Sequence, residues 1–143
     1  YPFDKAHDYV QHLLNHDLDF VTCDRYGQLH DGSMSPKHRF GNWVLSQTAR
    51  SLFRVRLRDS QSGMWIIRRE ALERLPIEAL PDGMAFSQEI KIHALRAKDI
   101  RAQEIPSELH PRIGDAVIES WRDGLGNLKA LFGLRLRGAR KVR

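Results

Sequence analysis

An acidic turn that leads into a short apolar strand is the part of this sequence best suited to chemistry. Asp59 opens the turn Asp59-Ser-Gln-Ser-Gly63, and the apolar run Met64-Trp-Ile-Ile67 follows it and ends at two arginines. Such a turn can direct a carboxylate into a cleft while the strand behind it fixes the backbone. Polar residues that converge at the end of a strand are common in sites that handle charged substrates. The turn therefore marks a candidate site for a charged ligand.

Helical and strand patterns alternate along the chain and must position this turn. Apolar spacing and capping signals predict helices over residues 4–16, 38–53, 70–75, 86–97 and 116–132. Short apolar runs bounded by turn residues predict strands over residues 19–23, 64–67 and 100–105, the last one closed by Pro106. Residues 24–37, rich in glycine, serine and proline, are predicted to form a long loop. This alternation predicts an α/β fold.

The composition favours one domain that folds around a core. The chain has 143 residues, 41% of them hydrophobic, which is enough apolar material for a single core. Its single cysteine, Cys23, excludes an internal disulfide and is typical of a reducing compartment. The sequence shows no signal peptide and no apolar run long enough to cross a membrane. We therefore expect a cytoplasmic location.

The positive charge of the chain is concentrated at its C-terminus. The formal net charge is +5, and residues 134–143 contain five basic and no acidic residues, so residues 1–133 sum to zero. The basic residues are Arg135, Arg137, Arg140, Lys141 and Arg143. A basic tail of this kind can bind anionic lipid headgroups, at about 1 kcal/mol per charge; a solvated, disordered tail is the alternative. Because the body is neutral and no recognition motif occurs, we expect no nucleic-acid binding.

Five segments, in order, resemble the motifs of one enzyme family. With the Asp59 turn in second place, the others are Gly32-Ser-Met-Ser-Pro-Lys-His-Arg-Phe-Gly-Asn42, Gly83-Met-Ala-Phe-Ser-Gln-Glu89, Gln103-Glu-Ile-Pro106 and Trp121-Arg-Asp-Gly124. In this order and spacing, the chain resembles the family 2 glycosyltransferases of the dolichol-phosphate mannosyltransferase-like group. The resemblance extends from Tyr1 to about Phe132.

The resemblance implies the C-terminal portion of a GT-A fold, with a mixed sheet flanked by helices, over residues 1–133. Members of the family hold Mg²⁺ or Mn²⁺ and the sugar-nucleotide diphosphate with an Asp-x-Asp motif that precedes a Thr-Tyr-Pro-like sequence. Because this chain starts at Tyr1-Pro2, the motif is expected immediately upstream of residue 1. The chain is then the C-terminal part of a longer enzyme. We expect no metal ligands in it and no turnover by it alone.

Two carboxylates are the candidate catalytic residues that the resemblance implies. In the family, an aspartate at the position of Asp59 lies by the acceptor, where it orients or deprotonates the nucleophile. An acidic residue at the position of Glu89 lies near the transferred sugar. Each also has a simpler interpretation. Asp59 is then a turn aspartate bonded to the backbone near Ser60, and Glu89 is a residue of a first helical turn, stabilised by the helix dipole by about 0.3–1 kcal/mol.

Three arginines are the candidate phosphate ligands that the resemblance implies. Arg25 and Arg39 would contact phosphates of the donor or the acceptor, because a guanidinium group presents a planar fork to phosphate oxygens. Arg112, in an Arg-Ile-Gly sequence, resembles the arginine of a loop that closes over the donor, although Asp115 replaces the usual serine and the following lysine is missing. The alternative for each arginine is a surface ion pair that contributes about 0–1 kcal/mol.

The activity that the resemblance implies is inverting transfer of a hexosyl group from a nucleotide sugar to an acceptor, expected to be a polyprenyl phosphate. A lipid phosphate is ionised near neutral pH and needs little help from a base, whereas a hydroxyl acceptor needs a base such as Asp59 or Glu89.

The expected partners are the nucleotide sugar, the lipid phosphate and, through residues 134–143, the cytoplasmic face of a membrane. The alternative is a non-catalytic binding or regulatory module that uses the basic tail on anionic membrane or nucleic acid.

Overall fold

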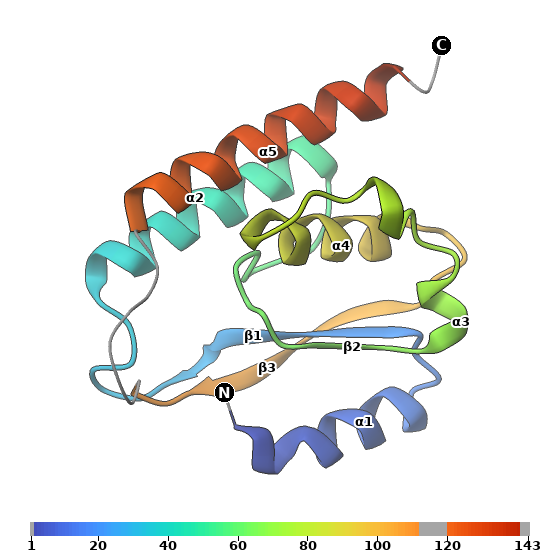
Figure 1. Cartoon of the computed structure of the whole chain (residues 1–143). Helices are drawn as coiled ribbons and strands as arrows, with labels where there is room; N and C mark the ends of the chain where they lie inside the picture. Colours follow the sequence, from blue (N-terminus) through green and yellow to red (C-terminus); the bar gives the residue numbers. More distant parts are fainter. Residues whose placement is uncertain (1, 112–119, 141–143) are drawn as a thin grey trace.

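A three-stranded mixed sheet lies at the centre of the computed structural model, which describes residues 2–111 and 120–140 (Figure 1). Strand β1 (Phe20–Leu29) is the middle strand. It pairs antiparallel with β2 (Trp65–Ile67) and parallel with β3 (Ala102–Leu109). The expected α/β fold with a mixed sheet flanked by helices is confirmed at this level of detail.

Helices lie on both faces of this sheet (Figure 1). In chain order they are α1 (Ala6–Asn15), α2 (Pro36–Phe53), α3 (Arg69–Leu72), α4 (Met84–Arg96) and α5 (Ser120–Arg140), with 3₁₀ turns at Phe3–Lys5 and Ile77–Ala79. Helix α1 covers one face of the sheet and α4 the other. Helices α2 and α5 pack against each other and form an outer layer above α4.

Apolar side chains fill the contacts between these layers. One core, which includes Leu13 and Val21, lies between α1 and the sheet. A second core, which includes Phe20 and Ile90, lies between the sheet and α4. A third core lies where α2, α4 and α5 meet, and it contains Leu57 from the loop that follows α2. Because Leu57 is completely buried in this core, the loop that carries Asp59 is anchored among the three helices.

Strand β1 is longer than the sequence predicted. Residues 24–29, which were expected to begin a loop, continue the strand because they pair with β3, with an irregularity between Asp24 and Gln28. Glycine suits the close approach of the two strands there. A Cβ atom at position 27 would lie only 2.6 Å from the Cβ of Pro106.

Strand β3 also runs further than predicted, through Pro106 to Leu109, so the prediction that Pro106 closes the strand was wrong. A proline is tolerated at this place for a physical reason. Within the described sheet β3 is an edge strand, and Pro106 lies opposite Asp24, where the regular pairing stops. A proline that cannot donate a backbone hydrogen bond is found at such edges and irregularities.

Helix α5 includes most of the residues expected to form a basic tail. It extends from Ser120 to Arg140, while residues 116–119 of the predicted helix lie outside the described residues. Leu134 is 8% exposed and belongs to the core between α2, α4 and α5. Residues 134–140 are therefore helical and not the disordered tail that was considered. Across the part of the chain that the structure describes, no helix combines the length and the apolar character needed to cross a membrane.

Candidate functional site

The loop of residues 57–64, between α2 and β2, is held by buried and partly buried polar side chains from five elements. Within the loop, Asp59, Ser60 and Ser62 are completely buried. Its partners are Arg25 on β1, Ser46 on α2, Gln88 and Lys91 on α4, Glu104 on β3 and Asn127 on α5. An unpaired polar group in such a place costs about 1–3 kcal/mol, so these bonds specify the conformation of the loop.

Asp59 and Arg25 form a buried ion pair with two parallel bonds. The Nε atom of Arg25 donates to Oδ2 of Asp59 at 2.6 Å, and Nη2 donates to Oδ1 at 2.8 Å. The backbone N–H of Arg25 also donates to Oδ2, at 3.2 Å. The N–H of Gln61 donates to Oδ1 at 3.1 Å, which is the turn contact of the simpler interpretation. The structure thus brings two predicted site residues into direct contact.

The Asp59 carboxylate is held in its ionised form. Burial alone raises the pKa of Asp59, but the hydrogen bonds and charge of Arg25, with the charge of Lys91, outweigh burial and lower this pKa below 3.8. Both carboxylate oxygens accept hydrogen bonds within the chain. The arrangement therefore suits Asp59 to orient Arg25, whereas accepting a proton would require one of these bonds to break.

Lys91 lies beneath the loop and is also completely buried. Its Nζ atom donates to the carbonyl oxygen of Ser62 at 2.6 Å and to that of Asp59 at 3.3 Å. Burial lowers the pKa of Lys91 to about 7, although the charge of Asp59 favours the protonated form. Lys91 thus fixes the loop backbone at two points while its own charge is poorly solvated.

Glu104 fixes the start of the loop from β3. Its Oε2 atom accepts a hydrogen bond from the N–H of Arg58 at 2.6 Å, and Oε1 accepts one from the N–H of Asp59 at 2.9 Å. Burial raises the pKa of Glu104, and the two backbone hydrogen bonds oppose this shift. Glu104 therefore acts as a positioning residue that holds the N–H of Asp59, while Lys91 holds its carbonyl oxygen.

Three amide side chains link the loop to α4 and α5. Gln61 donates from Nε2 to Oε1 of Gln88 at 2.6 Å, and Asn127 donates from Nδ2 to Oε1 of Gln61 at 2.7 Å. Gln88 in turn donates from Nε2 to the carbonyl oxygen of Asn127 at 3.2 Å. This ring of bonds couples the position of α5 to the loop that carries Asp59.

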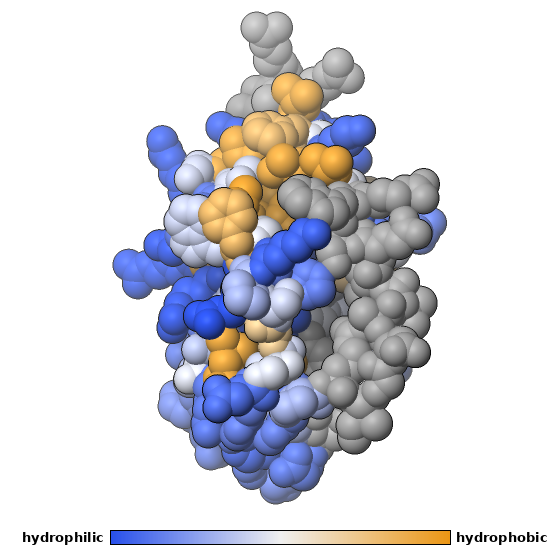
Figure 2. All heavy atoms as spheres, turned by 90° about the vertical axis from the view of Figure 1, so that its left-hand side faces the viewer, coloured by the Kyte–Doolittle hydropathy of each residue, from blue (hydrophilic) through white to orange (hydrophobic). Residues whose placement is uncertain are grey.

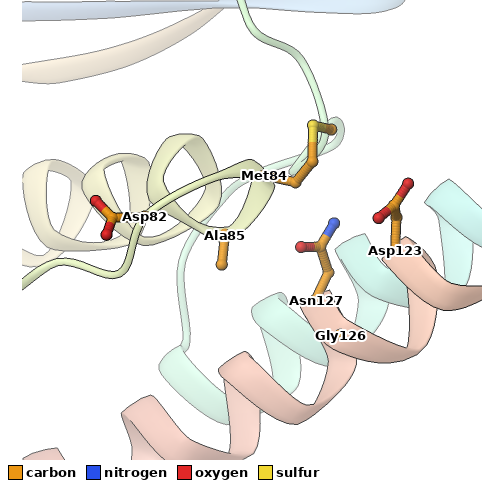
Figure 3. A pocket seen from close by; sticks show the side chains of 6 residues that line it. All are labelled: Asp82, Met84, Ala85, Asp123, Gly126 and Asn127. Carbon is orange, nitrogen blue, oxygen red and sulfur yellow. The ribbon is translucent and has the colours of Figure 1, made fainter. Parts of the chain in front are cut away.

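A hollow of about 270 Å³ opens between the N-terminal end of α4 and α5 (Figure 3). It is lined by Asp82, Met84, Ala85, Asp123, Gly126 and Asn127. Asn127 connects it to the loop through its bond to Gln61. The carboxylates of Asp82 and Asp123 would repel a diphosphate, since like charges placed close together are unfavourable. The hollow therefore suits a neutral, hydroxyl-rich group better than a phosphate.

Glu89 lies on α4 and pairs with a different arginine. Both of its carboxylate oxygens accept bonds from Nη2 of Arg137 in α5, at 2.9 and 3.0 Å, and the described contacts do not join it to Asp59. Because α4 begins at Met84, Glu89 lies beyond the first helical turn, so its interpretation as a first-turn residue was wrong. Burial raises the pKa of Glu89, and the charge of Arg137 opposes this shift.

The other two predicted phosphate ligands, Arg39 and Arg112, have no described contact with Asp59. Arg39 is exposed in the first turn of α2, and no described hydrogen bond or ion pair joins its side chain to Asp59. Arg112 lies outside the described residues. Of the three arginines, Arg25 is the one that the structure places at Asp59, and its pair is too buried to be an ordinary surface contact.

Three residues of the site were not predicted from the sequence: Lys91, Gln88 and Asn127. A signal for Lys91 existed, because it stands between Ile90 and Ile92 in the middle of a helix that covers the sheet. A lysine is almost never fully buried unless it has a partner, so such a position indicates a polar contact. The two amides carry no comparable signal, since their partners lie far away in the sequence.

The chain is similar to the low-salt glycan biosynthesis hexosyltransferase Agl6 of Haloferax volcanii, with 32% identity over 134 residues. The match covers 92% of this chain and 32% of the relative, so the chain spans about a third of the relative's length. No protein-family model matches the chain, and no solved structure matches it. The comparison supports a relationship to glycosyltransferases, which is coarser than the group that the motifs resemble.

Proposed function

We propose that this chain is the C-terminal part of an inverting GT-A glycosyltransferase that transfers a hexosyl group from a nucleotide sugar to a polyprenyl phosphate. The observation that carries the proposal is the 32% identity to a hexosyltransferase over 92% of the chain. The geometry adds support, because Asp59 and Arg25, two site residues that the family resemblance implies, are in direct contact.

In the proposed site Arg25 is the phosphate contact and Asp59 is its positioning residue. The two bonds between them fix the plane of the guanidinium, while Lys91 and Glu104 fix the backbone of Asp59. A positive group held in place stabilises a developing diphosphate without having to reorganise during the reaction. An ionised lipid phosphate needs little help from a base, which agrees with the hydrogen bonds that both Asp59 oxygens already accept.

The remaining parts of the proposed site depend on the longer protein. We place the Mg²⁺ or Mn²⁺ ion and most of the donor site on an Asp-x-Asp motif upstream of residue 1. Arg39 and Arg112 stay candidate phosphate ligands there. Glu89 stays a candidate base for a hydroxyl acceptor, a role in which the Arg137 pair would have to open.

Nucleotide binding tests whether most of the donor site lies outside residues 1–143. We expect the complete protein to bind a nucleoside diphosphate in the presence of Mn²⁺, and residues 1–143 alone to bind at least about tenfold more weakly, because the proposed Asp-x-Asp ligands of that ion lie outside them. Isothermal titration calorimetry with and without EDTA measures both. Tight binding by residues 1–143 that does not require a metal ion would contradict the proposal.

An apolar and basic surface over α2 and α5 supports action at a membrane. Figure 2 shows apolar side chains gathered over the end of the molecule where these helices lie. Phe40 and Trp43 stack with ring centroids 6.0 Å apart and are 67% and 54% exposed, and Leu136 is 66% exposed. Arg135 is exposed on the same helix as Leu136. Aromatic and basic side chains together are typical of surfaces that lie at lipid headgroups.

Vesicle binding tests this membrane surface. We expect the chain to sediment with phosphatidylcholine vesicles that contain phosphatidylglycerol, and less so as the salt concentration rises. Replacing Phe40 and Trp43 by serine should weaken binding at least about tenfold, because each ring loses apolar burial of about 1.5–3 kcal/mol. Leu14→Ser, at an exposed position of α1, is the matched control and should have little effect. Equal losses in both variants would show that α2 has no special part in binding.

A further inference from the structure

Two histidines and a glutamate lie together where β1 and β3 end. The parallel register pairs Gln28 with Glu108 and Leu29 with Leu109, and the N–H of His30 donates to the carbonyl oxygen of Leu109 at 3.2 Å. His30 and His110, the residues that follow the two strands, are therefore brought side by side. Glu108 stands two residues before His110, so a strand presents both on the same side.

The side-chain atoms of this cluster lie at the spacing of metal ligands. Nε2 of His30 lies 3.4 Å from Oε2 of Glu108, and Nε2 of His110 lies 3.3 Å from the same oxygen. The two imidazole rings stack with centroids 4.4 Å apart, and one ligand atom from each residue lies within 4.8 Å of the others. Ligands bound tetrahedrally to zinc at about 2.0–2.1 Å are separated by about 3.3 Å, so small side-chain movements would suffice.

The other oxygen of Glu108 is held by a lysine. Nζ of Lys5, from the turn before α1, contacts Oε1 of Glu108, which leaves the two histidines facing Oε2. A carboxylate that binds a metal ion through one oxygen is commonly held in place by a hydrogen bond to the other. Lys5 thus supplies the kind of support that a metal-binding carboxylate requires.

We propose that His30, Glu108 and His110 bind a transition-metal dication, with Zn²⁺ the best fit, and that the ion ties the ends of β1 and β3 together. Imidazole nitrogen favours zinc and its neighbours in the periodic table, whereas Mg²⁺ prefers oxygen ligands and several waters. Three protein ligands leave a fourth position for water or another small ligand. This site is separate from the proposed glycosyl transfer and from the Mg²⁺ or Mn²⁺ that it uses, so either proposal can fail alone.

Calorimetric titration of residues 1–143, without an affinity tag, with ZnCl₂ tests the site. We expect one ion per chain and at least a tenfold loss of affinity in each of the variants His30→Gln, Glu108→Gln and His110→Gln. Circular dichroism shows whether each variant remains folded. Co²⁺ in place of Zn²⁺ should give the visible absorption of a tetrahedral nitrogen–oxygen site in the wild type, and His110→Gln should remove it.

His16→Gln is the matched control, because His16 stacks on His12 at the surface of α1 without belonging to the cluster. It should leave the Zn²⁺ affinity unchanged. Absence of Zn²⁺ binding by the wild type overturns the proposal. So does undiminished binding by the folded His110→Gln variant, or an equal loss in His16→Gln. Each of these results would show that the two histidines and Glu108 form ordinary ion pairs.

Discussion

With asparagine in place of Asp59, the complete protein is expected to transfer hexosyl groups about 100-fold more slowly. Asparagine keeps the size of the side chain but removes the charge that holds the Nε and Nη2 atoms of Arg25. Loss of that orientation misplaces the positive group that would face the developing diphosphate, and misplacement of this kind costs on the order of 100-fold in rate. Initial rates with saturating nucleotide sugar and a polyprenyl phosphate measure the effect.

A double variant separates this loss from simple unfolding. Removing one partner of a buried pair costs about 3–5 kcal/mol, because the other charge is left uncompensated, while removing both avoids that cost. Asp59→Asn combined with Arg25→Gln should therefore recover much of the stability lost by either single variant, but none of the activity. Asp99→Asn, which removes a mostly exposed carboxylate beside Arg74, should change neither property. Joint recovery of stability and activity in the double variant would make the Asp59–Arg25 pair purely structural.

Elements whose formation depends on near neighbours were predictable from the sequence. Helices α2 and α4 and strand β2 lie close to their predicted positions, because each carries its own pattern of apolar residues and end signals. The ends of β1 and β3 were not predictable in this way. Residues 24–29 are largely polar and become a strand only by pairing with β3, which is distant in the sequence. A proline inside β3 then misled the prediction, because nothing local marks an edge strand.

The candidate site likewise has a part that was predictable from the sequence and a part that depends on distant contacts. The family resemblance implied a site that contains Asp59 and Arg25, and their side chains are in contact in the structure. The support beneath them was not predictable, since the contact of Lys91 with Ser62 depends on how α4 packs against the sheet. The metal-ligand spacing of His30 and His110 likewise follows from the parallel register and from no sequence motif.

Lys91 is expected to dominate the dependence of stability on pH just above neutrality. The unfolded chain carries a lysine with an ordinary pKa of 10.5, whereas burial lowers the pKa of Lys91 in the folded chain to about 7. Between these values the unfolded state binds more protons, so the free energy of unfolding rises with pH, by about 2 kcal/mol from pH 7 to pH 9. Well below pH 7 Lys91 is protonated in both states, and the full cost of burying its charge is present.

Cys23 sets the upper limit of the pH range in which the free energy of unfolding rises. Burial raises the pKa of its thiol from 9.0 to about 12. Above pH 9 the unfolded chain releases the thiol proton first, so this group lowers stability as pH rises further and opposes Lys91. Urea unfolding at several pH values from 7 to 9 therefore reports mainly on the lysine, because Cys23 contributes only near the upper end of this range. Lys91→Met should abolish the rise, whereas Lys129→Met, at an exposed position of α5, should preserve it. A rise that persists in the Lys91→Met variant would show that the ammonium group is better solvated than its complete burial implies.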